Sequence, residues 1–146
     1  MMKQQKYTAK QILCSLRRVD TLNRGLMEVA IAHAGIHQSQ HMVLMRIACM
    51  EKPCSQAELA RQMEVSPPAM AVNVRKLEEA GYVTRETNKM DKRYNRVLLT
   101  DKGKALVEES RQVFNQVDAK MFQGFTEEEM EQLAGFIERM RENLQK

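Results

Sequence analysis

Apolar residues recur every three or four positions over much of this chain, which is the period of an amphipathic helix. A long first helix is expected from Thr8 to about Ala34. Its apolar face holds Ile12, Leu16, Val19, Leu22, Leu26 and Val29. Gly35 interrupts this pattern. A second helix follows and ends ahead of Pro53, because a proline disfavours helical geometry in the residue before it.

Two serines mark the starts of two short helices in the middle of the chain. Ser55, with Glu58 three residues later, forms a capping-box pattern and predicts a third helix. Ser66 followed by Pro67 is the pattern of an N-cap with proline in the first helical position, and it predicts a fourth. Gly81 is expected to end this fourth helix.

After this glycine the apolar period changes from helical to alternating. Residues 82–87 and 94–99 are expected to be two strands, joined by the basic segment 88–93 into a β-hairpin. Helical spacing returns over residues 100–122, and a further capping box at Thr126 begins a last helix with an apolar face. The predicted fold is therefore mainly α with a small β-hairpin.

Two short helices followed by a hairpin form a winged helix-turn-helix, in which the second helix enters the major groove of DNA. We divide the chain into an N-terminal dimerisation helix (1–34), a winged DNA-binding module (35–100) and C-terminal dimerisation helices (101–146). The long terminal helices have apolar stripes that look too broad for one small domain to bury. Packing within one chain is the alternative for these stripes.

Composition fits a folded, intracellular protein. The chain has 146 residues, of which 43% are hydrophobic and 29% charged, as in ordinary globular domains. The first residues lack the apolar stretch of a secretory signal, and no run approaches the roughly 18 apolar residues of a membrane span. Three cysteines without a CxxC pair favour reduced thiols over disulfides or a zinc site. A cytoplasmic location is expected.

Charge is distributed unevenly. Residues 66–96 carry seven basic side chains against four acidic ones, whereas residues 118–146 carry four basic against seven acidic. The first segment suits a polyanion and the second does not.

The fourth helix supplies the candidates for reading DNA bases. With Met70, Val74 and Leu77 assigned to the core, the predicted contacts from this helix are Ser66, Pro68, Ala69, Val72, Asn73, Arg75 and Lys76. Asn73 suits adenine, and Arg75 or Lys76 suits guanine or phosphate. The alternative is that these are ordinary surface residues.

The hairpin tip supplies candidates for the DNA backbone or a narrow groove. We expect Lys89, Lys92, Arg93 and Arg96 to contact DNA, with Arg93 the most important. Asp91 is expected to form the turn or orient Arg93, because a carboxylate is repelled by phosphate.

Several short motifs together resemble the MarR family. They are Gln56 to Ala60 (QAELA), Val65-Ser66, Leu77 to Val83 (LEEAGYV), Asp91-Lys92-Arg93, Leu99-Thr100 and Gly103. The resemblance covers about Gly35 to Glu108 in detail. It implies a homodimer with interlocked terminal helices that reads a pseudo-palindrome in double-stranded DNA, most often as a repressor. The sequence departs from the family at Pro67, Pro68, Ala69 and Ala71, where members often have Ser or Thr, which favours contacts to thymine methyl groups.

The resemblance also implies a switch, either a small anionic aromatic effector or an oxidised cysteine. Cys14 is similar in position to the reactive cysteine of the peroxide-sensing branch, with Arg18 and Met27 near the places of that branch's tyrosines. Oxidation sensing by Cys14 and a buried, inert thiol are both open. His33, His37 and His41 lie at four-residue intervals and are candidates for an effector pocket or, alternatively, a metal site.

Other classes of function have less support. We find no nucleophile with a positioned base, no phosphate-binding glycine loop and no paired carboxylates, so the sequence predicts neither an enzyme nor a cofactor. A winged-helix module that binds protein instead of DNA remains the alternative.

Overall fold

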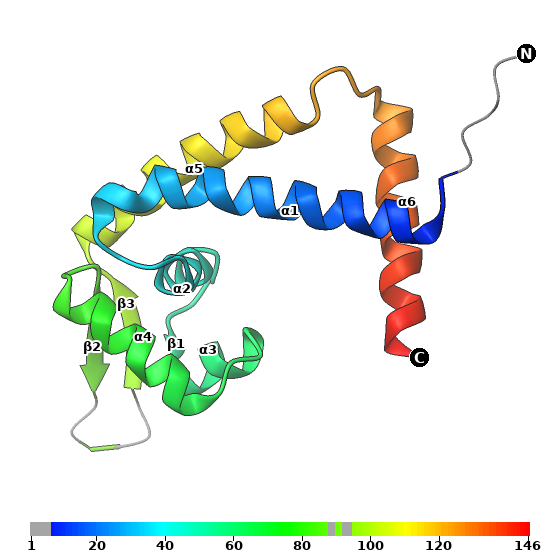
Figure 1. Cartoon of the computed structure of the whole chain (residues 1–146). Helices are drawn as coiled ribbons and strands as arrows, with labels where there is room; N and C mark the ends of the chain where they lie inside the picture. Colours follow the sequence, from blue (N-terminus) through cyan, green and yellow to red (C-terminus); the bar gives the residue numbers. More distant parts are fainter. Residues whose placement is uncertain (1–6, 88–89, 92–94) are drawn as a thin grey trace, which may run out of the picture. The chain divides into compact units, whose positions relative to one another are not determined.

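The computed structural model describes residues 7–87, 90–91 and 95–146 and confirms a mainly helical fold with a small β-sheet (Figure 1). Its elements are α1 (Ala9–Ile31), a 3-10 turn (Ala32–Ala34), α2 (Gln38–Ala48), β1 (Cys54–Ser55), α3 (Gln56–Gln62), α4 (Pro67–Glu79), β2 (Val83–Thr87), β3 (Asn95–Leu99), α5 (Asp101–Met121) and α6 (Glu127–Gln145). The chain forms two compact units, residues 1–114 and 115–146.

The caps expected from sequence start their helices. The hydroxyl of Ser55 accepts a hydrogen bond from the amide of Glu58 at 3.1 Å, and the Glu58 carboxylate accepts one from the Ser55 amide at 2.8 Å. Thr126 forms the same reciprocal pair with Glu129 ahead of α6. The first helix is shorter than expected, because its α-helical part ends at Ile31 and a 3-10 turn leads to Gly35.

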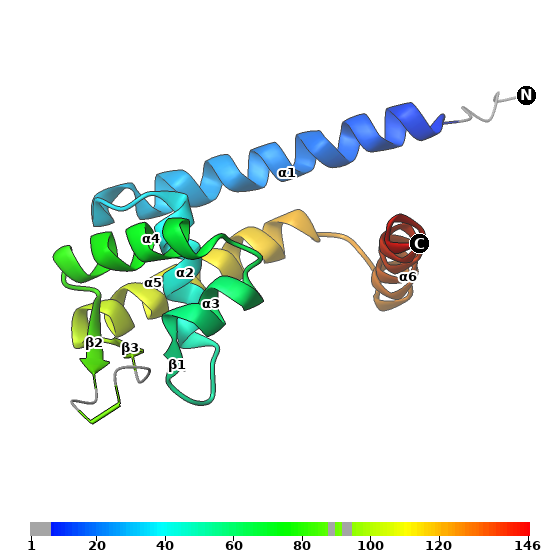
Figure 2. The same cartoon turned by 90° about the horizontal axis from the view of Figure 1, so that it is seen from below.

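The sheet has three antiparallel strands in the order β1-β3-β2. Val83 pairs with Leu99 between β2 and β3, and Cys54 pairs with Val97 between β1 and β3. The sequence analysis missed β1, since two residues are too few to show an alternating pattern. In both views the hairpin of β2 and β3 projects from the helices of the first unit (Figures 1 and 2).

The core of the first unit lies between α2, α3, α4 and the sheet. Its fully buried side chains are Val43, Leu44, Cys54, Leu59, Met70, Val74, Leu77 and Val97. Met70, Val74 and Leu77 are the three positions of α4 assigned to the core from sequence, and each is completely buried. One face of α4 is thereby fixed inward and the other is left outward.

A close contact ties the end of α4 to the start of α5. The Thr100 hydroxyl donates to the carbonyl of Gly81 at 2.6 Å and accepts from the amide of Gly103 at 3.1 Å. The Thr100 amide donates to the Tyr82 carbonyl at 3.1 Å. Gly81 has a left-handed φ of 80°, which favours glycine at the end of a helix. These motif residues therefore hold the scaffold together.

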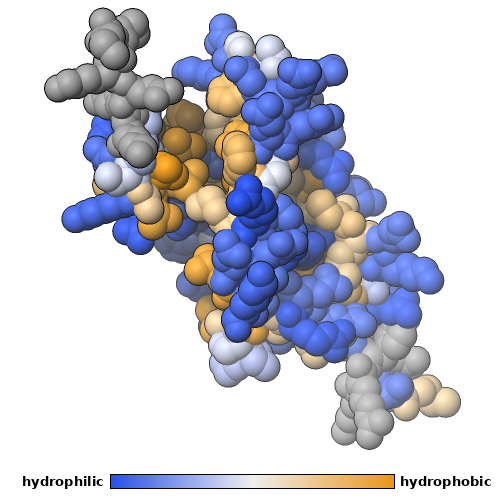
Figure 3. Space-filling model, turned by 90° about the vertical axis from the view of Figure 1, so that its right-hand side faces the viewer, coloured by the Kyte–Doolittle hydropathy of each residue, from blue (hydrophilic) through white to orange (hydrophobic). Residues whose placement is uncertain are grey.

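The terminal helices leave apolar side chains at the surface. In α1 the exposed ones are Ile12, Leu13, Leu16, Val19, Leu22, Leu26 and Val29, and in α6 they are Met130, Phe136, Ile137, Met140 and Leu144. Apolar side chains also reach the surface beside polar ones on the face drawn in Figure 3. Within the part of the chain that is described, no helix is long and apolar enough to cross a membrane.

Candidate nucleic-acid interface

The N-cap, the first residue and the preceding turn fix how α4 begins. The Ser66 hydroxyl accepts from the amide of Ala69 at 3.4 Å, and Pro67 begins the helix, where the missing N–H needs no partner. The turn before it, from α3 to α4, includes Glu64 with a left-handed φ of 54°. A short turn and a rigid proline start thus fix the direction of the helix.

The predicted base-reading residues lie on the outward face of α4. Six of them are exposed: Ser66, Pro68, Ala69, Val72, Arg75 and Lys76. Asn73 is half-buried, and its Oδ1 accepts from the Ser39 hydroxyl at 3.5 Å. Ser39, in the first turn of α2, was missed from sequence because 34 residues separate it from its partner.

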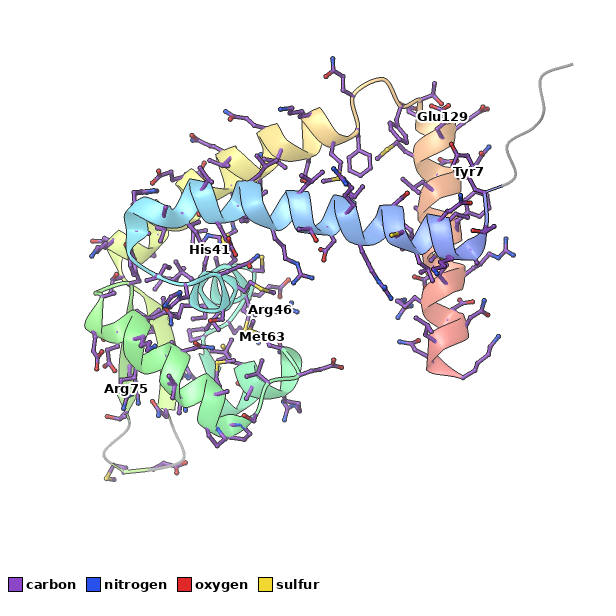
Figure 4. The ribbon with its side chains drawn as sticks, in the orientation of Figure 1. Tyr7, His41, Arg46, Met63, Arg75 and Glu129 are labelled. Carbon is purple, nitrogen blue, oxygen red and sulfur yellow. The ribbon has the colours of Figure 1, made fainter. Side chains whose placement is uncertain are left out.

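Acidic side chains neighbour two of the arginines in this region. Arg75 Nε lies 3.8 Å from Glu79 Oε1, one helical turn away on an exposed surface (Figure 4). Such exposed pairs contribute little stability, so Arg75 is able to exchange its partner for a phosphate at small cost. Arg85 of β2 lies closer to its acidic partner than Arg75 does, with its Nε 3.0 Å from Glu78 Oε2.

The hairpin is described only in part. Lys89, Lys92 and Arg93, three of the predicted DNA contacts, lie outside the described residues. Asp91 is exposed, and Arg96 is half-buried in β3, where it pairs with Ser55 of β1 and Glu86 of β2. The role of Asp91 in orienting Arg93 stays a prediction.

The three histidines have different surroundings. His33 is exposed, with Nε2 3.0 Å from Glu109 Oε1. His37 is the N-cap residue of α2, and its amide donates to Gln40 Oε1 at 3.0 Å. His41 is buried, with Nε2 2.8 Å from the Ser110 hydroxyl and its ring edge-on to Phe114 (Figure 4). Among the described residues, no three His, Cys, Asp or Glu side chains are placed to hold a metal ion.

Only one of these histidines lines the pocket of about 450 Å³ beside α2. The residues around this pocket are His41, Met42, Met45, Arg46, Cys49, Gln62, Met63, Glu64 and Phe114. The volume is in the range of small-molecule sites. His33 and His37 are not among its lining residues, and an effector role for the three histidines stays a prediction.

Burial lowers the pKa of His41, because the charged imidazolium is poorly solvated there. The folded state then binds a proton less readily than the unfolded chain, whose histidine titrates near 6.5. Stability should therefore be steady above about pH 7 and fall as pH decreases through 6.5, by at most about 1.4 kcal/mol per pH unit. Urea denaturation at several pH values measures this slope.

His41→Gln should flatten that pH dependence, since the group that resists protonation is gone. His33→Gln is the matched control on the exposed histidine and should leave most of the slope in place. An unchanged slope in His41→Gln would contradict the assignment.

The cysteines also differ in exposure. Cys14, the predicted redox residue, is exposed on α1, and Cys49 is exposed at the end of α2. Cys54 is buried in β1, and desolvation raises the pKa of its thiol. Oxidation sensing by Cys14 stays a prediction.

Comparison with known proteins shows similarity to one family. Residues 36–94 match the family model described as the MarR family. The structure resembles a MarR protein from Peptoclostridium difficile, with a TM-score of 0.74 and 26% identity, covering 99% of this chain and 92% of that one. It also resembles MepR from S. aureus in a DNA complex (TM-score 0.78, 20% identity, 96% and 99% coverage). A third match is CouR from Rhodococcus jostii, bound to p-coumaroyl-CoA. Its TM-score is 0.68 and its identity is 23%, covering 92% of this chain and 89% of that one.

Proposed function

The chain belongs to the MarR family of winged helix-turn-helix transcriptional regulators, and from this premise we propose that it is a cytoplasmic repressor rather than an enzyme. It binds a pseudo-palindromic operator as a homodimer and releases it when a small effector binds. The observation that carries the proposal is the outward face of α4, which is exposed along the positions that a recognition helix presents to the major groove.

The chemistry of that face indicates how bases are read. Pro68, Ala69 and Val72 offer apolar contacts to thymine methyl groups, and Val72 keeps 42% of its surface exposed. Asn73 offers its amide to adenine, because Ser39 occupies only one lone pair of Oδ1. MepR, which has this fold, has been solved in a DNA complex, and this supports DNA as the partner.

The homodimer is supported by the exposed apolar faces of α1 and α6. A monomer that leaves this many large apolar side chains in water is expected to bury them against a second copy. Symmetry then places two α4 helices on one duplex, which explains why a pseudo-palindrome is expected.

An effector is supported by the pocket beside α2 and by the ligand complex of CouR. His41, Arg46 and Gln62 are lining residues whose side chains are able to donate hydrogen bonds to a ligand's oxygen atoms. The pocket adjoins the turn before α4, so a bound molecule has a short route to the recognition helix.

Selection of bound fragments from sheared genomic DNA tests the function. An inverted repeat should be recovered, with affinity that falls steeply as salt increases and is weakened by Arg93→Ala. Recovery of no enriched sequence, with weak binding that ignores this substitution, would overturn the proposal and favour a protein partner instead.

Asn73→Ala should weaken operator binding by about 1–3 kcal/mol and relax the preference at one base position, because a base contact is lost. Asn115→Ala, an exposed asparagine in the second unit, is the matched control and should bind normally. Fluorescence anisotropy on operator and random duplexes separates the effects. An equal loss on both duplexes would mean that Asn73 supports the fold instead of reading a base.

A further inference from the structure

Tyr82 lies where three parts of the first unit meet. Its amide donates to the carbonyl of Leu77 in α4 at 2.9 Å, and its own carbonyl accepts from the Thr100 amide ahead of α5 at 3.1 Å. Its hydroxyl donates to the carbonyl of Ala34 at 2.9 Å, across 48 residues of chain. The residue is only 5% exposed, and Lys102 Nζ lies 4.5 Å from the centroid of its ring. The backbone and the ring are therefore held in place, and the hydroxyl meets Ala34 from a fixed position.

The carbonyl that Tyr82 holds belongs to the joint between α1 and α2. Ala34 is the last residue of the 3-10 turn, and Gly35 follows it with a left-handed φ of 66°. The chain changes direction at this joint, between the N-terminal helix and the first helix of the winged module (Figure 1). The Tyr82 hydroxyl thus ties the joint to the end of the recognition helix.

The joint decides the direction of α1, because the rest of that helix is not buried against the chain. Of its 23 residues only Ile31, at its last position, is buried. Apolar packing of Ile31 is not directional, whereas a hydrogen bond is. A second tie of the turn, from His33 Nε2 to Glu109 Oε1 at 3.0 Å, joins two exposed side chains, and such pairs contribute little. The contact of Tyr82 with Ala34 is therefore the one best placed to set the angle of α1.

A small change of angle at this joint becomes a large displacement at the far end of α1. A helix of 23 residues is about 34 Å long, so a tilt of about 10° moves its start by about 6 Å. This exceeds the roughly 3.4 Å between neighbouring base pairs of DNA. In the proposed homodimer, which is joined through α1, the displacement changes the distance between the two α4 helices.

We propose that Tyr82 is a positioning residue for operator binding. Its hydroxyl, through the carbonyl of Ala34, sets the angle between α1 and α4, and this angle sets the half-site spacing that the dimer accepts. Tyr82 is buried and does not contact DNA itself. The effect on spacing rests on the proposed function, in which a homodimer binds an inverted repeat, whereas the effect on the angle does not.

Tyr82→Phe removes one oxygen atom and keeps the buried ring, so it isolates the hydrogen bond. Pulsed electron spin resonance measures the distance between a spin label on Cys14 in α1 and one on the cysteine introduced by Ala69→Cys in α4. Cys49→Ser removes the other exposed thiol, and Cys54 is buried. Dilution with unlabelled protein leaves only distances within one chain. Tyr82→Phe should broaden this distance distribution, or shift its mean, by about 3 Å or more, and an unchanged distribution would overturn the proposal.

Tyr7→Phe is the matched control, because it removes the same hydroxyl from a side chain that is 70% exposed ahead of α1. It should leave the distance unchanged, and an equal change there would count against the Ala34 contact. Gly35→Ala perturbs the joint without touching Tyr82, since an added Cβ meets no atom within 4 Å and only the left-handed φ is disfavoured. It should change the same distance. A change in Gly35→Ala without one in Tyr82→Phe would show that the turn sets the angle without the hydroxyl.

Operator duplexes whose half-sites are moved closer or apart by one or two base pairs test the spacing. The parent protein should prefer one spacing by at least about tenfold, since two linked modules lose their advantage when both cannot bind at once. Tyr82→Phe should flatten this preference or move it to another spacing, with affinity for a single half-site unchanged.

The outcomes of the two experiments separate the steps of the proposal. A loss of equal size on a single half-site would mean that Tyr82 supports the winged module instead of setting the angle. A spacing preference that stays in place while the distance changes would refute the link to operator binding. Failure of the parent protein to bind any operator would refute the proposed function, and the distance result would still decide the role of the hydroxyl.

Discussion

Replacing Gly103 by alanine is expected to destabilise the first unit by about 3 kcal/mol or more, the upper end of what overpacking costs. A Cβ at this position would lie 2.1 Å from the carbonyl oxygen of Tyr82. Backbone cannot move aside as a flexible side chain does, and this carbonyl also accepts the hydrogen bond from the Thr100 amide. Relief of the clash therefore breaks the contact between the end of α4 and the start of α5. Urea denaturation followed by circular dichroism measures the loss.

Gly135→Ala is the matched control, because a Cβ at Gly135 meets no atom within 4 Å. Its helical neighbours in α6 include Glu131, Glu138 and Arg139, so it lies away from the apolar face. Alanine there should stabilise the helix by about 1 kcal/mol. If alanine changed the free energy of unfolding in the same direction at both glycines, the steric explanation would be contradicted.

Val19→Glu in α1 is expected to give a folded monomer that binds the operator at least about 100-fold more weakly, since two linked modules bind far more tightly than one. Val19 is 47% exposed in the single chain and lies in the middle of the apolar stripe. The carboxylate costs little in a monomer but would be buried in an apolar dimer interface. Light scattering and anisotropy with operator DNA measure the two effects.

Thr21→Glu adds the same charge two residues along, on the polar side of α1, and controls for repulsion between protein and DNA. It should keep the dimer and reduce affinity only modestly. A dimer that persists in Val19→Glu, with normal binding, would mean that the stripe of α1 is not the interface. The apolar face of α6 would then be the next surface to substitute.

The motif residues and the outward residues of α4 have different tasks. Tyr82, Thr100 and Gly103 lie in the contact between α4 and α5, where geometry leaves little freedom. The outward positions of α4, such as Ala69 and Val72, are exposed and contribute little to the core. A family resemblance concentrated in the first group therefore identifies the fold but leaves the operator sequence open.

Local signals in the sequence determined most of the elements. A serine or threonine cap with its partner three residues later, as at Ser55 and Thr126, acts within one helical turn and is visible without any tertiary contact. The same is true of the period of apolar residues, which correctly assigned Met70, Val74 and Leu77 to the core. The outward face of α4 was then predicted from the residues that remain once these three core positions are set aside.

The tertiary structure alone decided the features that join distant residues. The two-residue strand β1 exists because β3 pairs with it, and Ser39 reaches Asn73 across 34 residues of chain. Equal spacing suggested one site for His33, His37 and His41, yet the 3-10 turn and Gly35 place them in different surroundings, and only His41 reaches the pocket. Met63 joins Met45 and Cys49 there because α3 packs beside α2. Sequence spacing fixes neighbours within a helix, whereas packing between helices fixes which of those neighbours share a site.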